Sequence, residues 1–204
     1  FQEFNKKFYI PNNAVLVVDG DFEKDQAKQW IKKYFAEIKK GPAITRGSFT
    51  EAPITTQINA TYEDPNVQLP MLVASYRTAS MKSRDARVLD MVSSYLSDGK
   101  SSVLYKKMVD KNKTALQVGA MNFSQEDHGL YLIFGLPMTG KTSADLIKEI
   151  DEEIVKVQTE LISERDFQKL QNIFESRYVS SNSSLEGVAE NLASYYLLYG
   201  DVNL

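Results

Sequence analysis

The chain has 204 residues, of which 43% are apolar and 25% are charged, a composition typical of a globular protein with a sizeable core. Its 24 basic and 27 acidic residues leave a formal charge of −3, which argues against a dedicated nucleic-acid surface. Because there is no cysteine and only one histidine, His128, the chain alone cannot build a disulfide, a thiol active site or a zinc site with two histidines.

No membrane-spanning or targeting segment is expected. The longest apolar runs, residues 14–18 among them, are far shorter than the roughly 20 residues that span a bilayer. The first residues mix polar and aromatic side chains, unlike a signal peptide. The chain lacks an initiator methionine and stops at Asn203-Leu204, so we expect both ends to be cuts in a longer polypeptide. We expect a soluble protein of the bacterial periplasm or cytoplasm, and the choice between them stays open.

The first third of the chain predicts one strand, one helix and a linker. Residues 14–18, Ala-Val-Leu-Val-Val, form a continuous β-branched run that is typical of a buried strand. A helix follows whose apolar side chains recur at helical spacing, and Gly41-Pro42 is expected to end it. Residues 43–53 contain glycine, serine, threonine and one proline, which indicates a linker between two structural units.

The middle of the chain predicts two strands followed by two helices. Residues 54–62 alternate in polarity, with Thr55, Gln57, Asn59 and Thr61 on the polar side of a half-solvated strand. Residues 70–77 are more apolar and predict a central strand. Ser83 is a suitable N-cap for a helix that ends at Asp98-Gly99, and a short helix is expected over residues 102–110.

The last part of the chain predicts a hairpin and three helices. Residues 115–123 and 130–136 form two strands whose short polar connection favours an antiparallel pair. Helices are expected over residues 143–160, after a capping pair Ser163-x-x-Asp166, and up to Tyr199 with Gly200 as the C′ residue. Strands in antiparallel pairs and helices in blocks indicate an α+β fold, with helices packed on one face of an antiparallel sheet.

One motif suggests a nucleotide site. Residues 135–142, Gly-Leu-Pro-Met-Thr-Gly-Lys-Thr, match the P-loop pattern, in which Gly135 and Gly140 shape the loop, Lys141 reaches the phosphates and Thr142 holds Mg²⁺. A P-loop strand must lie in a parallel sheet, however, whereas this strand follows its neighbour through a hairpin-like connection. The sequence therefore favours a glycine turn and a threonine N-cap, and the nucleotide site is kept as an alternative.

Two other groups of polar residues predict no chemistry. His128 lies in the polar connection of the hairpin, where a lone histidine is usually solvated. Glu152 and Glu153 belong to an acidic helical stretch, for which a solvated face is the expected role.

A series of short stretches, in this order, carries a family resemblance. Residues 8–14, Phe-Tyr-Ile-Pro-Asn-Asn-Ala, precede the valine-rich strand, Gly20-Asp21-Phe22 and a helix ending in Lys-Tyr-Phe at residues 33–35. Val-Ala-Ser-Tyr at residues 73–76 is followed by a helix and by Leu-Ser-Asp-Gly-Lys-Ser-Ser-Val-Leu at residues 96–104. With the strand pair and the helical tail after Ser163, the whole chain resembles the pitrilysin/insulinase family of zinc metallopeptidases, which includes the mitochondrial processing peptidase.

The resemblance implies a domain without the catalytic metal. In that family each half-molecule has two similar α+β domains, and two halves close around a chamber that holds peptides. Zinc is held in the first domain by the two histidines of H-x-x-E-H and a distant glutamate, and the glutamate of the motif activates the zinc-bound water. The single histidine cannot supply this motif, so we expect no cofactor in this chain and zinc in a missing catalytic domain.

The resemblance also implies boundaries and partners. Residues 1–42 would close the preceding catalytic-type domain, residues 43–53 would be the linker, and residues 54–204 would form the second, non-catalytic, metallohydrolase-like domain, truncated at its C-terminus. The expected partners are the catalytic domain, a second half-molecule and a peptide substrate, with no nucleic acid and no membrane. Thr55, Gln57, Asn59 and Thr61 are the candidate peptide contacts.

Active members of the family also use an arginine, and a tyrosine seven positions later, to assist the substrate carbonyl from the opposite half. Here those positions hold Val109 and Leu116, whose side chains cannot donate a hydrogen bond. We therefore expect no catalytic residue in this chain. The parent protein would be a zinc endopeptidase, or alternatively a structural subunit with the same fold and no protease activity, as in the core proteins of the respiratory bc complex.

Overall fold

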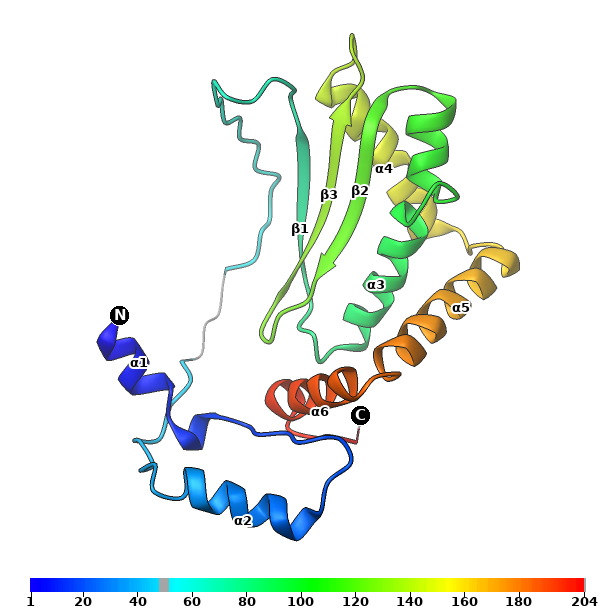
Figure 1. Ribbon diagram of the computed structural model, residues 1–204. Coiled ribbons are helices and arrows are strands. Elements are labelled where there is room, and N and C mark those ends of the chain that lie inside the picture. Colours follow the sequence, from blue (N-terminus) through cyan, green and yellow to red (C-terminus); the bar gives the residue numbers. More distant parts are fainter. Residues whose placement is uncertain (48–51, 204) are drawn as a thin grey trace. The chain divides into compact units, whose positions relative to one another are not determined.

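The computed structural model describes residues 1–47 and 52–203 (Figure 1). They divide into two compact units, Phe1–Thr50 with Phe174–Leu204, and Glu51–Ile173. Every described side chain in the buried class lies in the second unit, which also contains the sheet.

The sheet of the second unit has three antiparallel strands. These are β1 (Leu72–Thr78), β2 (Ala115–Phe123) and β3 (Gly129–Pro137), in the order β1-β3-β2 (Figure 1). The hairpin register places Ala120 opposite Ile133, and on the other side of β3 Ile133 lies opposite Ala74. The predicted hairpin and its antiparallel direction are therefore confirmed.

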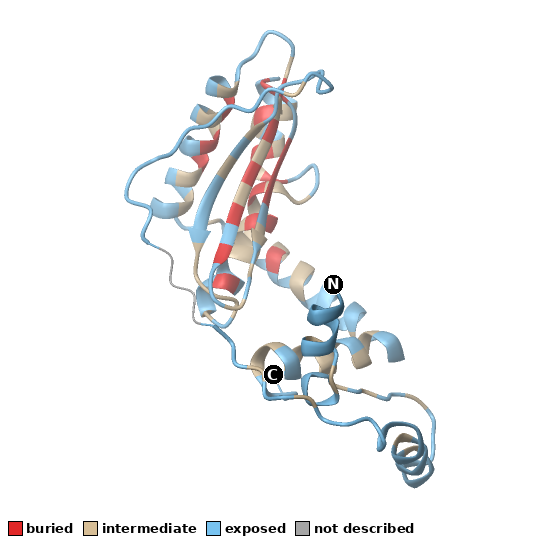
Figure 2. Cartoon of the chain, turned by 90° about the vertical axis from the view of Figure 1, so that its left-hand side faces the viewer, coloured by how far each residue is buried: buried red, intermediate tan, exposed pale blue. Residues whose placement is uncertain are grey.

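Helices cover one face of this sheet. Helix α3 (Arg84–Ser97) and the π-helix η2 (Tyr105–Lys111) pack on β2, and α4 (Ser143–Thr159) packs on β3 and β1. Along β3 buried residues alternate with more exposed ones, as expected for a sheet covered on one side (Figure 2). The α+β fold class, with helices on one face of an antiparallel sheet, is confirmed.

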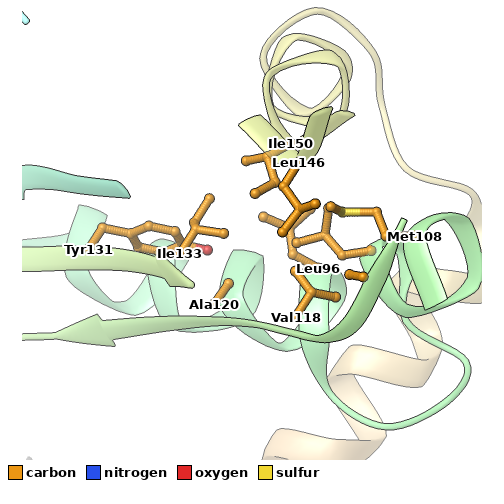
Figure 3. Packing of buried hydrophobic residues seen from close by; sticks show 10 residues of the cluster. Leu96, Met108, Val118, Ala120, Tyr131, Ile133, Leu146 and Ile150 are labelled. Atoms are coloured by element: carbon orange, nitrogen blue, oxygen red, sulfur yellow. The ribbon is translucent and has the colours of Figure 1, made fainter. Parts of the chain in front are cut away.

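The core lies between α4, η2 and the hairpin. Ile133, Leu146 and Ile150 are completely buried, as is Met108 from η2 (Figure 3). Gly135 allows α4 to approach β3 closely, because a Cβ at this position would lie 2.8 Å from Leu146 Cδ2. The sheet and α4 therefore form one packed body.

The helix ends follow the capping residues that the sequence predicts. Ser83 Oγ accepts from the Asp85 amide at the start of α3, and Ser163 Oγ accepts from the Asp166 amide at the start of α5 (Glu164–Ser181). Helix α6 (Leu185–Tyr199) ends at Gly200, whose φ of +79° is the left-handed C′ conformation.

The short helix predicted for residues 102–110 is present but differs in type. Its main part is η2, in which the Asn112 amide donates to the Lys107 carbonyl, five residues back. The Thr114 amide and hydroxyl both lie within hydrogen-bond distance of the Met108 carbonyl, at 2.9 and 3.3 Å, and end this wide turn. Met108 thus enters the core, while Lys107 reaches α4.

In the first unit, one predicted strand is not formed. The unit contains α1 (Gln2–Phe8), a 3₁₀ turn η1 (Pro11–Asn13) and α2 (Lys24–Phe35), which ends well before Gly41. Residues 14–18 pair with no strand in the described chain, and Leu16 and Val18 are about half exposed. The strand prediction is wrong for this structure because a β-branched run becomes a strand only when its backbone groups find a pairing partner.

Among the described residues, every helix is too short or too polar to cross a lipid bilayer.

Leu146 tests the packing of α4 on the hairpin. We expect Leu146→Ala to lower the free energy of unfolding by about 2–5 kcal/mol, because the cavity would lie at a fully buried position. Val155→Ala on the exposed side of α4 is the control and should change it by less than about 0.5 kcal/mol. Urea unfolding followed by circular dichroism measures both, and equal effects would contradict the proposed core.

Candidate functional site

The P-loop-like segment forms a capped turn. Gly140 has a φ of +81°, and the Lys141 amide donates to the Met138 carbonyl at 2.8 Å, which closes the turn after β3. Thr142 caps α4: its Oγ accepts from the Asp145 amide at 3.2 Å, and the Asp145 carboxylate accepts from the Thr142 amide at 2.8 Å.

The charge in this turn also disfavours a phosphate site. The hydrogen bond from the Thr142 backbone, followed by that from its hydroxyl, holds the pKa of the Asp145 carboxyl below its ordinary value. A carboxylate thus occupies the helix N-terminus that would bind phosphate in a P-loop. Because β3 also has antiparallel neighbours on both sides, the geometry favours the capped turn over the nucleotide alternative.

The four predicted peptide contacts lie in an irregular segment. Thr55, Gln57, Asn59 and Thr61 are all exposed, and Gln57 Nε2 donates to Asn59 Oδ1 at 3.0 Å. Residues 52–62 contain no helix or strand, and the apolar side chain of Ile58 is as open to solvent as its polar neighbours, at 80%. The predicted half-solvated strand is therefore wrong for this structure, whereas the peptide contact itself stays a prediction.

The remaining single residues have no catalytic surroundings. His128 is exposed in the hairpin connection, Val109 belongs to η2, and Leu116 lies at an irregularity in the register of β2. Within residues 1–47 and 52–203, no group of three or more histidine, aspartate or glutamate side chains is arranged to hold a metal ion.

A charged network joins η2 to α4, and sequence reasoning missed it. Lys107 Nζ donates to Glu152 at 2.7 Å and to Glu153 at 2.8 Å, and Lys156 Nζ donates to the same Glu153 oxygen at 2.8 Å. The Glu153 side chain is only 6% exposed, so the prediction of a solvated acidic face is wrong for this residue. The cause is the long Lys107 side chain from a distant part of the chain, which helical periodicity cannot reveal.

The network shifts the pKa values of both partners. Burial alone would raise the pKa of Glu153, but the hydrogen bonds from Lys107 and Lys156 outweigh it and hold that pKa below its ordinary value. Burial alone would lower the pKa of Lys107, but its hydrogen bonds to Glu152 and Glu153 outweigh it and raise that pKa. Both groups are therefore charged at neutral pH and hold η2 against α4.

The face of the sheet opposite the helices is mostly apolar. We call it the open face and define it by six apolar, outward-pointing residues of the three strands: Val73, Met121, Phe123, Leu130, Leu132 and Phe134. Two polar residues of β1 share this face, Ser75 opposite Leu132 and Arg77 opposite Leu130. Val73, Met121, Phe123 and Leu130 are 39–51% exposed.

Comparison with known proteins gives a match to one family. The family described as the peptidase M16 inactive domain matches residues 1–174. The zinc protease PqqE of Helicobacter pylori is 27% identical over 203 residues, which are 98% of this chain and 46% of the relative. The chain therefore spans about half the length of the curated relatives that it matches.

Solved structures show the same fold. A protease from Helicobacter pylori superposes with a TM-score of 0.80 at 24% identity, over 97% of this chain and 48% of that one. A peptidase M16 inactive domain from Pseudomonas fluorescens superposes with a TM-score of 0.73 at 14% identity, over 98% and 47% of the two chains.

Thr142 tests the capped turn. We expect Thr142→Ala to lower the free energy of unfolding by about 1 kcal/mol, because the Asp145 amide loses its acceptor. Thr142→Ser keeps the hydroxyl and should retain most of that stability. Calorimetric titration with Mg-ATP should detect no binding. A binding signal that Lys141→Ala abolishes would instead support the nucleotide site.

Glu153 tests the buried network and its pH dependence. We expect Glu153→Gln to lower the free energy of unfolding at pH 7 by about 1–3 kcal/mol, since Lys107 loses its charged acceptor. The pKa of Glu153 is lower in the folded state than in the unfolded state. The difference in the free energy of unfolding between wild type and Glu153→Gln should therefore be complete above the unfolded-state pKa. It should disappear as the pH falls through the folded-state pKa.

The partly exposed pair Lys169–Asp166, 3.8 Å apart, supplies the control for this experiment. Lys169→Met should cost less than about 0.5 kcal/mol. A Glu153→Gln effect that is this small, or that persists undiminished at acidic pH, would contradict the role of the network.

Proposed function

The chain belongs to the peptidase M16 inactive-domain family, and we propose that it forms a passive part of the wall around the peptide-holding chamber of a zinc endopeptidase. It is a non-catalytic domain of the zinc-protease family. The match over residues 1–174 is the observation that carries this proposal, because the chain supplies no chemistry of its own that competes with it.

The chain's own residues do not fit the zinc ion of the family. A zinc site of this type needs two histidines, and the chain has one, in an exposed connection. We therefore assign zinc and the activated water to a separate catalytic domain and derive no catalytic step for this chain. A bacterial relative supports a bacterial protein, and we propose the periplasm or the cytoplasm as its compartment.

The first unit supports a connection to such a domain. Residues 14–18 are extended, and the apolar side of α2 exposes Trp30, Tyr34 and Phe35 to between 53% and 65%. An apolar segment that pairs with no strand among the described residues and a helix with an exposed apolar side are expected of part of an α+β layer that lacks the rest of its sheet. We propose that residues 1–42 complete the preceding catalytic-type domain.

The remaining boundaries follow from that assignment. We propose residues 43–53 as the linker and residues 54–204 as the second domain, with the catalytic domain and a second half-molecule as partners. Thr55, Gln57, Asn59 and Thr61 are proposed to face the peptide, and all four are exposed. No nucleic acid is proposed, since the net charge of −3 offers no excess of basic residues.

Zinc content and peptidase activity test this function. We expect the purified chain, dialysed against a chelator and then against buffer, to retain substoichiometric zinc and to cleave no fluorogenic peptide. Combined with the catalytic domain that carries H-x-x-E-H and with the second half-molecule, it should form a complex that cleaves peptides in a zinc-dependent manner. His128→Ala should not change this activity, because His128 is an exposed residue to which we assign no role in catalysis or peptide contact.

Two results would contradict the proposal. Near-stoichiometric zinc or peptide cleavage by the chain alone would show a metal site of its own. A stable complex of this chain with the H-x-x-E-H catalytic domain and the second half-molecule that cleaves no peptide would favour the structural-subunit alternative.

A further inference from the structure

The open face is more apolar than the solvent side of an antiparallel sheet normally is. Such sheets alternate apolar residues toward the core with polar residues toward water. On β3, however, Tyr131, Ile133 and Gly135 face the helices, while Leu130, Leu132 and Phe134 face outward. A strand that is apolar on both sides is expected to be in contact on both sides, and exposed apolar patches of this kind mark binding surfaces.

The strand register brings the open face together in rows. Phe134 lies between Val73 and Gly119, Leu132 between Ser75 and Met121, and Leu130 between Arg77 and Phe123. Neighbouring strands are about 4.8 Å apart, and outward side chains of one strand repeat about every 6.8 Å. Every second side chain of an extended peptide points to the same side, and these side chains are also about 6.8 Å apart. Alternate side chains of a bound peptide can therefore contact consecutive rows of the open face.

The packing of Phe134 gives the open face its shape. A Cβ at Gly119 would lie 2.5 Å from two ring atoms of Phe134, so the ring lies directly over the Gly119 backbone. The lack of a side chain at Gly119 therefore leaves room on β2 for the ring of Phe134.

The charge of the open face indicates an uncharged occupant. The six residues that define it are apolar, and the polar neighbours in the same rows are the uncharged Ser75, opposite Leu132, and the charged Arg77, at the end of β1 opposite Leu130. Burying a carboxylate or an ammonium group against apolar residues without a partner is strongly unfavourable. A charged segment would thus be excluded, whereas an apolar one would gain from contact.

The size of the open face favours a peptide over a second copy of the chain. At their observed exposed fractions, the six side chains of the open face together expose roughly 400 Å². This estimate takes on the order of 150–250 Å² for a fully exposed aromatic side chain. A stable protein–protein interface needs about 800 Å² on each partner. The face matches a short segment instead, with three or four apolar side chains.

We propose that the open face is a subsite for an extended peptide segment whose alternate side chains are apolar and uncharged. This inference rests on the proposed function, since it states which part of a chamber wall selects the peptide and by which chemistry. Phe134 and Leu132 form the centre of the subsite, and Val73 and Met121 form its two sides.

A matched pair of variants tests the subsite. Val73 and Val155 are 51% and 53% exposed, the first on the open face and the second on the outer side of α4. In the natural polypeptide that contains this chain, we expect Val73→Glu to weaken binding of a fluorescent peptide with alternating leucine and phenylalanine by tenfold or more, as measured by anisotropy. Val155→Glu should change it by less than twofold.

A second peptide distinguishes apolar selection from general peptide binding. Its alternating leucine and phenylalanine residues are replaced by glutamate and lysine, and we expect the wild-type protein to bind it at least tenfold more weakly. Equal binding of both peptides, or equal effects of the two valine variants, would overturn the subsite. If Val73→Glu leaves peptide cleavage by the assembled protease unchanged, the subsite is overturned as well. The proposed function would still stand in that case.

Accessibility is tested without relying on a charged variant. Because the chain has no cysteine, Val73→Cys and Val155→Cys each introduce one thiol that a maleimide dye can label selectively. We expect both to react at similar rates and excess apolar peptide to protect only the first. Two results would overturn the inference by showing another occupant. One is a Val73→Cys variant that does not react with the dye. The other is protection that depends on protein concentration and coincides with a dimer in light scattering.

Discussion

The packing of β3 is the constraint on which the second unit depends. This strand pairs on both edges, and its inward side chains fill the space under α4, where Leu146 and Ile150 meet Ile133. Gly135 sets the distance between the two layers, because any larger residue would push Leu146 away from the sheet. The turn after Pro137, the cap at Thr142 and the start of α4 all follow from the need to return the chain over β3.

The parts of the fold that the sequence predicted are those whose determinants are local. The hairpin between residues 115 and 137 carries its alternation and its polar connection within one short stretch, and Ser83, Thr142 and Gly200 mark helix ends by their own side-chain or backbone chemistry. The wrong predictions, residues 14–18 and 54–62, are strands whose formation depends on backbone partners elsewhere. A periodic pattern indicates that a segment is able to pair, but it carries no information about whether a partner is present.

The candidate site divides in the same way. Exclusion of a zinc site followed from the count of histidine and cysteine, which requires no structure. The Lys107 network and the contact of the Phe134 ring with the Gly119 backbone could not be predicted from the sequence, since each joins residues from two different elements. The run of acidic residues predicted a solvated face for Glu153, whereas the structure buries this residue and brings Lys107 from the π-helix to its carboxylate.

The aspartate that follows the P-loop pattern has a consequence for motif searches in general. In this chain the P-loop sequence pattern ends at Thr142 and is followed three positions later by Asp145. The Asp145 carboxylate accepts hydrogen bonds from the amide and the hydroxyl of Thr142. Such an arrangement satisfies the donors at the head of the helix internally and leaves a negative charge where a phosphate would have to enter. Scanning programs that penalised an acid at this position behind an antiparallel hairpin would discard this kind of false positive without any coordinates.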